Sequence, residues 1–158
     1  MLGQKVLLNQ MPIAIKDSKI DISSEETTKE LAKDLTHYLK GGEIIYLYGE
    51  MGVGKTTFVK FLINNLQLKF KQKLTEVTSP TFNIMNEYNI KDLSIKHYDL
   101  YRLKSSKELQ DLNMFREDDK SILFIEWPQI IKEKPDLVTK LYFEYENEYE
   151  NRFIKVFN

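Results

Sequence analysis

The architecture of this protein follows from eight residues, Gly49-Glu50-Met51-Gly52-Val53-Gly54-Lys55-Thr56. They match the pattern G-x-x-x-x-G-K-[ST], which forms the loop that holds phosphate groups in nucleoside triphosphatases. Glycines allow the backbone N–H groups of such a loop to turn toward the phosphates, and the N-terminus of the following helix adds the positive end of its dipole. We therefore expect a nucleoside triphosphate here, with Lys55 on its β- and γ-phosphates and the Thr56 hydroxyl on Mg²⁺. The expected contacts come from Glu50, Met51, Gly52, Val53, Gly54, Lys55, Thr56 and Thr57.

The residues on either side of this loop have the patterns of a strand and a helix. Residues 44–48 are an unbroken apolar segment, which is typical of a strand buried on both faces. After the loop, Phe58, Leu62 and Leu66 recur at helical spacing and predict one apolar face of a helix. Strand, glycine loop and helix is the order that the motif requires. This order argues against the alternative, a glycine-rich turn with an exposed lysine.

A second buried strand is predicted at residues 122–125, and it ends in an acid, Glu126. The carboxyl ends of the parallel strands in such a sheet lie at one edge, where ligands bind. The Glu126 carboxylate is therefore expected beside the phosphate loop and close to Mg²⁺. Pro128 then ends the strand, because proline cannot donate a hydrogen bond to the ladder.

Two extended stretches, residues 82–88 and 94–100, follow the helix after the phosphate loop. The linker of residues 89–93 is too short for a crossover helix, so we predict an antiparallel hairpin. Alternation along the second stretch places His97 and Asp99 on one face of the strand. A polar strand face is either exposed or binds something. For His97, a packed or strand-face role is favoured over a catalytic one.

The remaining elements complete an α/β fold. Residues 1–18 are expected to form an N-terminal arm, either a short strand or poorly ordered chain, and residues 19–158 a single P-loop ATPase domain. We predict a P-loop NTPase-like mixed β-sheet of about six or seven strands, with an antiparallel hairpin insertion and few flanking helices. Its further parts are a strand at 19–22, a helix opened by a Ser23-x-x-Glu26 capping box and stopped by Gly41-Gly42, a helix at 105–115, a solvated turn at 117–120, and a hairpin of residues 141–145 and 152–157.

Composition sets limits on the class of protein. The chain has 158 residues and a formal net charge of −1, so bulk electrostatic binding of nucleic acid is not expected. A short basic run, Lys69, Lys71 and Lys73, is interpreted as a solvated loop in preference to an RNA contact. The absence of cysteine excludes disulfides and cysteine metal sites. No apolar run approaches the length of a transmembrane helix, and we expect a cytoplasmic protein with no membrane contact.

Four blocks of the sequence together resemble the TsaE (YjeE) family, small bacterial ATPases needed for the threonylcarbamoyl modification of adenosine 37 in certain tRNAs. The resemblance runs from about Ser24 to Arg152, and Asn113 departs from it where the family usually has a glycine. Three loop residues, Glu50, Met51 and Val53, also differ from the more usual ones, at variable positions. The four blocks are Gly49 to Phe58, Ser79-Pro80-Thr81-Phe82, His97-Tyr98-Asp99-Leu100-Tyr101-Arg102-Leu103 and Ile125-Glu126-Trp127-Pro128.

The resemblance implies roles for individual residues. Thr56 and Glu126 correspond to the Mg²⁺ ligands, the acid either directly or through water. Asp99 corresponds to an acidic position near the γ-phosphate, where it would orient water or hold the outer shell of the metal. The alternative is that Asp99 pairs with Arg102 or Lys55. Lys55, Asp99 and Glu126 are thus the expected catalytic residues.

The resemblance also implies two further nucleotide contacts. Thr81 corresponds to a switch threonine that senses the γ-phosphate, as switch loops of GTPases do. Its alternative role is to cap a turn after Pro80. The start of the first helix would lie near the adenine and bring Ser24, Glu25 and Thr28 close to it, although ordinary helix capping explains Ser24 equally well.

Three functional classes fit these residues: an ATPase switch in a tRNA-modifying assembly, a small-molecule P-loop kinase, and a nucleotide-gated binding protein with negligible turnover. A kinase needs an acceptor pocket and commonly an arginine-bearing lid, and between Asp99 and Ser121 the only arginines are Arg102 and Arg116. We therefore favour the ATPase. Its partners, by resemblance, are the TsaD and TsaB proteins, with tRNA contacted only through that complex. Slow hydrolysis is expected because no arginine is obviously placed to neutralise charge on the γ-phosphoryl group. Arg102 is the only nearby candidate, and it is tied to a strand end.

Overall fold

The computed structural model describes residues 19–116 and 118–157, and within them seven strands form one sheet in the order β1-β7-β6-β2-β5-β4-β3. The predicted α/β fold with a mixed sheet of six or seven strands is therefore confirmed. The predicted N-terminal arm lies outside the described residues. The strands are β1 Lys19–Asp21, β2 Ile44–Tyr48, β3 Met85–Ile90, β4 Leu93–Asp99, β5 Ile122–Glu126, β6 Thr139–Glu146 and β7 Asn151–Phe157.

The centre of the sheet is parallel and its margins are antiparallel. Strand β2 pairs in parallel with both β5 and β6, and β4 pairs in parallel with β5. The hairpins β3–β4 and β6–β7, and the pairing of β1 with β7, are antiparallel. Leu47 near the end of β2 pairs with Glu126 at the end of β5. The phosphate loop and Glu126 thus lie at the same edge of the sheet, as the sequence predicts.

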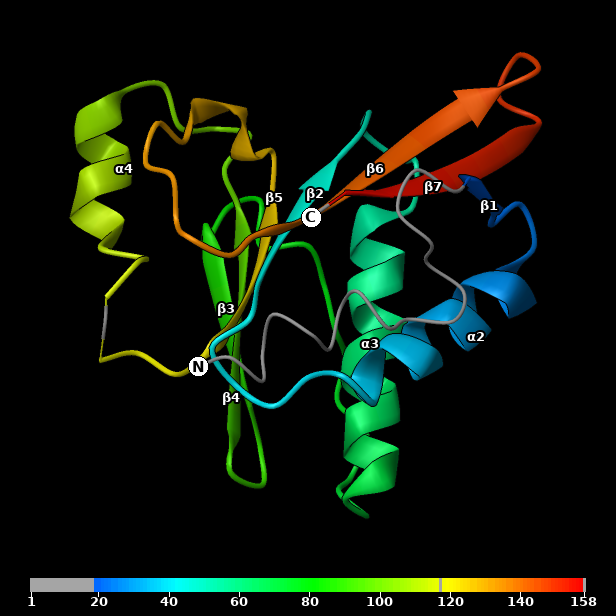
Figure 1. The fold of residues 1–158 in the computed structure, drawn as a ribbon, viewed down its shortest axis with the longest axis horizontal. Coiled ribbons are helices and arrows are strands. Elements are labelled where there is room, and N and C mark those ends of the chain that lie inside the picture. Colours follow the sequence, from blue (N-terminus) through cyan, green and yellow to red (C-terminus); the bar gives the residue numbers. More distant parts are fainter. Residues whose placement is uncertain (1–18, 117, 158) are drawn as a thin grey trace.

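Helices cover both faces of the sheet (Figure 1). Helices α2, Glu25–Thr36, and α3, Lys55–Lys69, pack on one face, while α4, Ser106–Leu112, and the short 3-10 helix η1, Pro128–Ile130, lie on the other. The side chains of β2 alternate between the two cores. Ile45 and Leu47 join the core under α2 and α3, and Tyr46 joins the core under α4. Burial on both faces explains why β2 is apolar throughout.

The first helix begins and ends at residues other than those predicted. Its N-cap is Ser24, whose hydroxyl accepts a hydrogen bond from Thr27 N at 3.1 Å, so the proposed capping box starting at Ser23 is wrong by one residue. The helix ends at Thr36, before Gly41-Gly42. The two glycines lie instead in the turn before β2, where both have positive φ angles. Gly41 has a φ of +120°, and a Cβ there would lie 3.1 Å from the Lys120 carbonyl oxygen.

The predicted hairpin after α3 is confirmed as antiparallel, with shifted bounds. It consists of β3 and β4, joined by a turn in which Lys91 has a φ of 53°. The prediction that the first strand begins at Phe82 is wrong. Ile84 N donates a 2.6 Å hydrogen bond to Pro80 O, so this segment forms a turn and leaves the Phe82 side chain 83% exposed.

Two further turns differ from their predicted form. Helix α4 starts with a capping box between Ser105 and Glu108, but it ends at Leu112 because Asn113 adopts a left-handed conformation, with a φ of 46°. Asparagine tolerates this conformation better than most residues, so it can end the helix here. The turn before β5 is less solvated than predicted, because Asp119 is half-buried and pairs with Lys96.

Candidate functional site

The loop between β2 and α3 has a backbone path that glycine makes possible. Gly49 has a φ of +145°, and a Cβ there would lie 2.7 Å from Phe143 O and 2.9 Å from Val53 Cγ1. Gly54 has a φ of 114° and is the N-cap of α3. The loop therefore passes very close to β6 and enters α3 directly, so that its backbone N–H groups and the helix N-terminus lie together.

The other loop residues divide between the core and the surface. The Val53 side chain is fully buried, whereas the Met51 side chain is 66% exposed. The Tyr145 hydroxyl donates a 2.7 Å hydrogen bond to Gly52 O and so ties the loop to β6. Val53 can thus meet a phosphate only through its backbone, while Glu50 and Thr57 lie exposed at the loop's rim.

Lys55, the first residue of α3, is buried although it carries a charge. Its ammonium donates to the carbonyl oxygens of Gly49 and, at 3.1 Å, Glu50, and it lies 4.0 Å from the centroid of the Trp127 ring. Burial lowers the pKa of Lys55, against the opposing charges of Glu126, Asp99 and Glu50. The ammonium thus lies inside the loop, where a triphosphate chain would meet it.

Glu126 brings two other elements of the site together. Its Oε1 accepts a 2.8 Å hydrogen bond from the Thr56 hydroxyl and lies 2.8 Å from Nε2 of His97. Both Glu126 and His97 are buried, at 3% and 0% exposure. A hydroxyl and a carboxylate side by side are hard oxygen donors, the kind that Mg²⁺ takes together with phosphate oxygens and water. These residues fit a magnesium ion at the phosphate loop.

The Asp99 side chain forms hydrogen bonds with the segment between α3 and β3. Its Oδ2 accepts 3.1 Å hydrogen bonds from the hydroxyls of both Ser79 and Thr81, and its Oδ1 accepts one from Tyr101 N. The Asp99 carboxylate therefore does not form the alternative ion pair with Arg102 or Lys55. The Arg102 guanidinium instead lies 4.5 Å from the centroid of the Phe82 ring. Asp99 therefore connects Thr81 to the end of β4, beside Glu126.

The residues suggested for the adenine are engaged within the first turn of α2. Glu25 is exposed and pairs with Lys29 at 2.9 Å. Thr28 is buried, and its hydroxyl donates to Ile22 O and Ser24 O. Their contact with a nucleotide stays a prediction.

Sequence reasoning missed two side chains of the last hairpin that reach the loop. One is Tyr145, described above. The other is Arg152, whose Nη1 would lie 3.9 Å from a Cβ built on Gly54. The structure thus places a second arginine beside the phosphate loop, and the position of Arg102 relative to a γ-phosphate stays a prediction. An arginine and a tyrosine in a terminal hairpin carry no local signal of a site, because only the pairing of β6 with β2 places them there.

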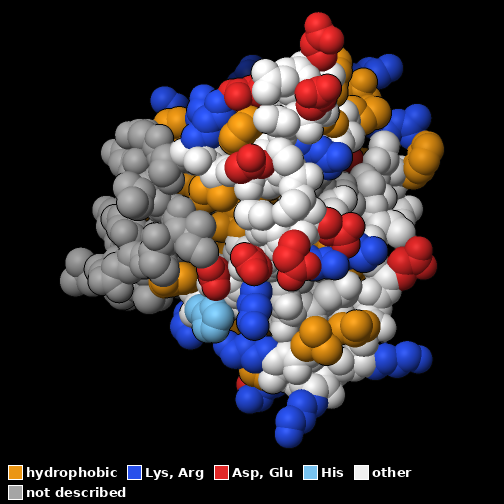
Figure 2. Space-filling view, turned by 90° about the vertical axis from the view of Figure 1, so that its right-hand side faces the viewer, with side chains coloured by type: hydrophobic (Ala, Val, Ile, Leu, Met, Phe, Trp, Pro, Cys, Tyr) orange, Lys and Arg blue, Asp and Glu red, His pale blue; other side chains and the backbone are white. Residues whose placement is uncertain are grey.

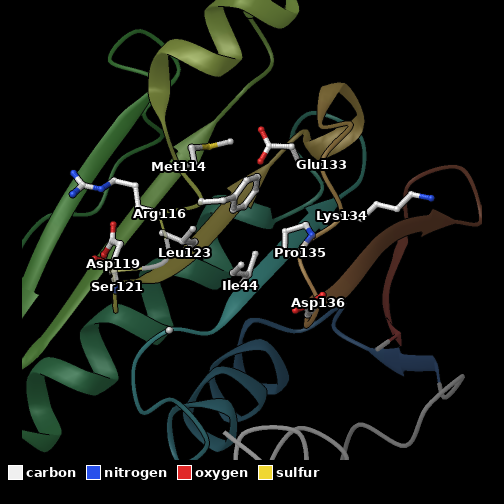
Figure 3. A pocket seen from close by; sticks show the side chains of 12 residues that line it. Ile44, Met114, Arg116, Asp119, Ser121, Leu123, Glu133, Lys134, Pro135 and Asp136 are labelled. Carbon is white, nitrogen blue, oxygen red and sulfur yellow. Dashed lines mark hydrogen bonds between the residues drawn. The ribbon is translucent and has the colours of Figure 1, made fainter.

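A hollow of about 460 Å³ lies at the other end of the sheet (Figure 3). It is lined by residues where β2 and β5 begin, such as Ile44 and Leu123, whereas the phosphate loop follows the end of β2. Arg116 and Lys134 extend at its margins (Figure 3). The sequence indicated no pocket for a second substrate. This hollow lies away from the phosphate loop, whereas a phosphate acceptor would have to bind beside that loop.

The surface carries both signs of charge. On the side shown in Figure 2, acidic side chains lie across the middle and lysine and arginine side chains gather below them. Lys69, Lys71 and Lys73 are all exposed, as predicted for a solvated segment. Large apolar side chains are also exposed, including Phe82 at 83% and Tyr101 at 52%. In the described ranges no helix is long and apolar enough to cross a membrane.

The chain is similar to known proteins along most of its length. The family model described as "Threonylcarbamoyl adenosine biosynthesis protein TsaE" matches residues 22–154. The tRNA threonylcarbamoyladenosine biosynthesis protein TsaE of Rickettsia felis is 40% identical over 111 residues, which are 70% of this chain. The match spans 63% of that relative, less than two thirds of its length.

Two other matches extend further. The protein of the same name from Aquifex aeolicus is 35% identical over 138 residues, which are 87% of this chain and 96% of the relative. Among solved structures, the crystal structure of YdiB from Bacillus subtilis is similar with a TM-score of 0.65 and 26% sequence identity. That similarity covers 88% of this chain and 84% of YdiB.

Proposed function

This chain belongs to the TsaE family of threonylcarbamoyl adenosine biosynthesis proteins, and we propose that it is the Mg²⁺-dependent, ATP-binding and ATP-hydrolysing subunit required for threonylcarbamoylation of adenosine 37 in tRNA. It acts as a nucleotide switch that resets a transferase formed by TsaD and TsaB type proteins. The tRNA meets the protein only through that complex, in the cytoplasm.

One observation carries the ATPase proposal. The Thr56 hydroxyl and the Glu126 carboxylate lie 2.8 Å apart at the N-terminus of α3, next to the buried Lys55 ammonium. A phosphate-loop hydroxyl, an acid at the end of a neighbouring parallel strand and a lysine inside the loop are the parts that bind Mg²⁺ and a triphosphate. Here Lys55 and Thr56 are neighbours in the chain, and Glu126 comes from 70 positions further on to meet them.

Each group has a task in hydrolysis. The loop N–H groups and Lys55 would bind the β- and γ-phosphates, and Thr56 and Glu126 would hold Mg²⁺, which when bound supplies positive charge to the phosphate oxygens. Asp99 lies beside Glu126 across the β4–β5 pair and is placed to orient the attacking water or the outer shell of the metal. Catalysis of this kind rests on positioning and electrostatic stabilisation.

The link from nucleotide to partner runs through Asp99. Its bonds to Ser79 and Thr81 hold the segment that carries the exposed Phe82 side chain, and Tyr101 lies on the other side of the same acid, in ring contact with Trp127. A change at the γ-phosphate that draws Thr81 away from Asp99 would move Phe82. We place the partner contact at residues 79–82 and 126–128.

The decisive experiment measures phosphate release and modified adenosine together, with and without TsaD and TsaB type partners. Hydrolysis by the purified protein is expected to be slow and to rise when both partners are added. An arginine supplied by a partner can raise such rates by about 10³–10⁵. Unchanged ATPase activity, together with full multi-turnover modification in the absence of this protein, would contradict the proposal. Transfer of labelled phosphate to a small acceptor would instead support a kinase.

A further inference from the structure

We infer that His97 is a positioning residue, whose Nε2–H fixes the Glu126 carboxylate in the orientation that binds Mg²⁺. This inference rests on the proposed function and adds to it a residue that does not itself touch the metal or the nucleotide. The interaction to be explained is the 2.8 Å contact between His97 Nε2 and Glu126 Oε1, between two fully or almost fully buried side chains.

The sheet determines that these two side chains meet. His97 lies on β4 opposite Phe124 of β5, and two residues further along Asp99 lies opposite Glu126. Side chains two residues apart on a strand share a face, so His97 and Asp99 both face the side on which Glu126 lies. Such packing leaves the imidazole ring little freedom to turn away, because it has no exposed surface.

The hydrogen bond also determines which ring nitrogen carries the proton. A carboxylate oxygen accepts, so the donor is Nε2–H. The other nitrogen, Nδ1, is buried and has no hydrogen-bond partner within residues 19–116 and 118–157. Within the described part of the chain, the ring is therefore held by one polar contact, which is with Glu126.

Two hydrogen bonds then reach the same oxygen of Glu126. The Thr56 hydroxyl approaches Oε1 from α3 and the His97 ring approaches it from β4. Together they restrain rotation of the carboxylate, so that its other oxygen, Oε2, keeps one orientation. Groups that orient a ligand in this way typically change metal affinity by about 10- to 100-fold when they are removed.

The test compares His97→Met, which keeps the volume but removes the donor, with His97→Gln, whose amide can still donate. Binding of a fluorescent ATP analogue is titrated with Mg²⁺, and binding is also measured in excess chelator. For His97→Met we expect the Mg²⁺ concentration that gives half of the Mg²⁺-dependent increase in binding to rise about 10- to 100-fold. The affinity for the ATP analogue in excess chelator should change by less than about twofold. His97→Gln should recover most of the difference. The exposed His37→Gln is the matched control.

These readouts separate a positioning role from a merely structural one. Loss of fold would weaken binding equally with and without Mg²⁺, and it would not be recovered by glutamine. An unchanged Mg²⁺ requirement in a folded His97→Met protein would overturn the inference and leave the proposed function intact. Absence of any Mg²⁺ effect in the unaltered protein would remove the proposed function itself.

A second measurement needs no change at position 97. The chain has two histidines, so ¹⁵N spectra of the imidazole rings are assigned simply by comparison with His37→Gln. We expect the proton of His97 on Nε2, and a shift of that signal when a non-hydrolysable ATP analogue and Mg²⁺ are added. A proton on Nδ1 with none on Nε2 would overturn the inference, even if His97→Met did not fold.

Discussion

The Thr56 hydroxyl donates a 2.8 Å hydrogen bond to Glu126 Oε1 across 70 positions of the chain. Thr56 lies in the first turn of α3 and Glu126 is the last residue of β5. The contact depends on the parallel pairing of β2 with β5, which brings the start of α3 to the carboxyl end of β5. It joins the two protein oxygens that we propose as the Mg²⁺ ligands.

Thr56→Ala should weaken Mg²⁺-dependent hydrolysis more than it weakens nucleotide binding in chelator. The substitution removes a metal donor and leaves Glu126 with one bond fewer, but it leaves the loop backbone in place. Lys60→Ala is the control, since Lys60 is exposed on the same helix and lies outside the phosphate loop. Steady-state phosphate release over a range of Mg²⁺ concentrations distinguishes the two. Equal losses in both variants would argue against a metal role for Thr56.

Lys55→Ala should weaken ATP binding by roughly 10- to 100-fold, because hydrogen bonds to charged groups contribute about 1.5–3 kcal/mol each. Calorimetric titration with ATP and Mg²⁺ measures the change. Lys60→Ala, an exposed lysine on the same helix, should bind ATP as the unaltered protein does. Full affinity in the Lys55 variant would contradict the assignment of the loop.

Trp127 should report nucleotide binding through its fluorescence. It is the single tryptophan of the chain, and its ring lies 4.0 Å from the Lys55 ammonium. Since a triphosphate would take hydrogen bonds from that ammonium, the charge over the indole ring changes on binding. We expect a saturable change of emission with ATP in the unaltered protein, and a much smaller one in Lys55→Ala at the same occupancy. An emission spectrum insensitive to saturating ATP would count against this geometry.

Gly49→Ala should destabilise the fold as well as the site. A Cβ there would meet Phe143 O at 2.7 Å, and the φ of +145° is unfavourable for alanine. Backbone strain of about 1–3 kcal/mol and overpacking of a similar size both oppose it. At Gly52 the φ is +80°, but a Cβ there would come no closer than 3.7 Å to another atom. Gly52→Ala should therefore lower the free energy of unfolding by less. Chemical denaturation of both variants measures the difference.

The Asp119–Lys96 pair should make stability depend on pH in the acid range. Burial alone raises the pKa of Asp119, but hydrogen bonds from Lys96 and Ser121 outweigh it and lower the pKa from 3.8 to about 2. A lowered pKa in the folded state contributes stability above about pH 4, and this contribution is lost as the pH falls toward 2. Asp119→Asn should therefore lose about 1 kcal/mol at neutral pH and converge with the unaltered protein near pH 2. Urea unfolding at several pH values tests this, with exposed Asp111→Asn as the control.

The strands, loop and helix that a motif or hydrophobic spacing marks in the sequence could be predicted. The strand at 44–48, the glycine loop and the helix after it follow from a motif and from hydrophobic spacing over short range, and β2 and α3 have the expected places. The acid at the end of residues 122–125 could be placed beside the loop because parallel strands end at one edge of the sheet. Ends of elements were less predictable. One hydrogen bond, such as that from Ile84 N to Pro80 O, turned an expected strand into a turn.

The phosphate loop, its strand and helix, and the acid that faces it can be inferred from the sequence alone, because each is encoded by residues that are neighbours in the chain. Three contacts could be seen only in the folded chain: His97 contacts Glu126, Asp99 holds Thr81, and Arg152 of β7 lies beside Gly54. These contacts join strands and loops whose relative positions depend on the pairing order of the whole sheet. No local propensity records that order, because it depends on how apolar faces from distant parts of the chain bury one another.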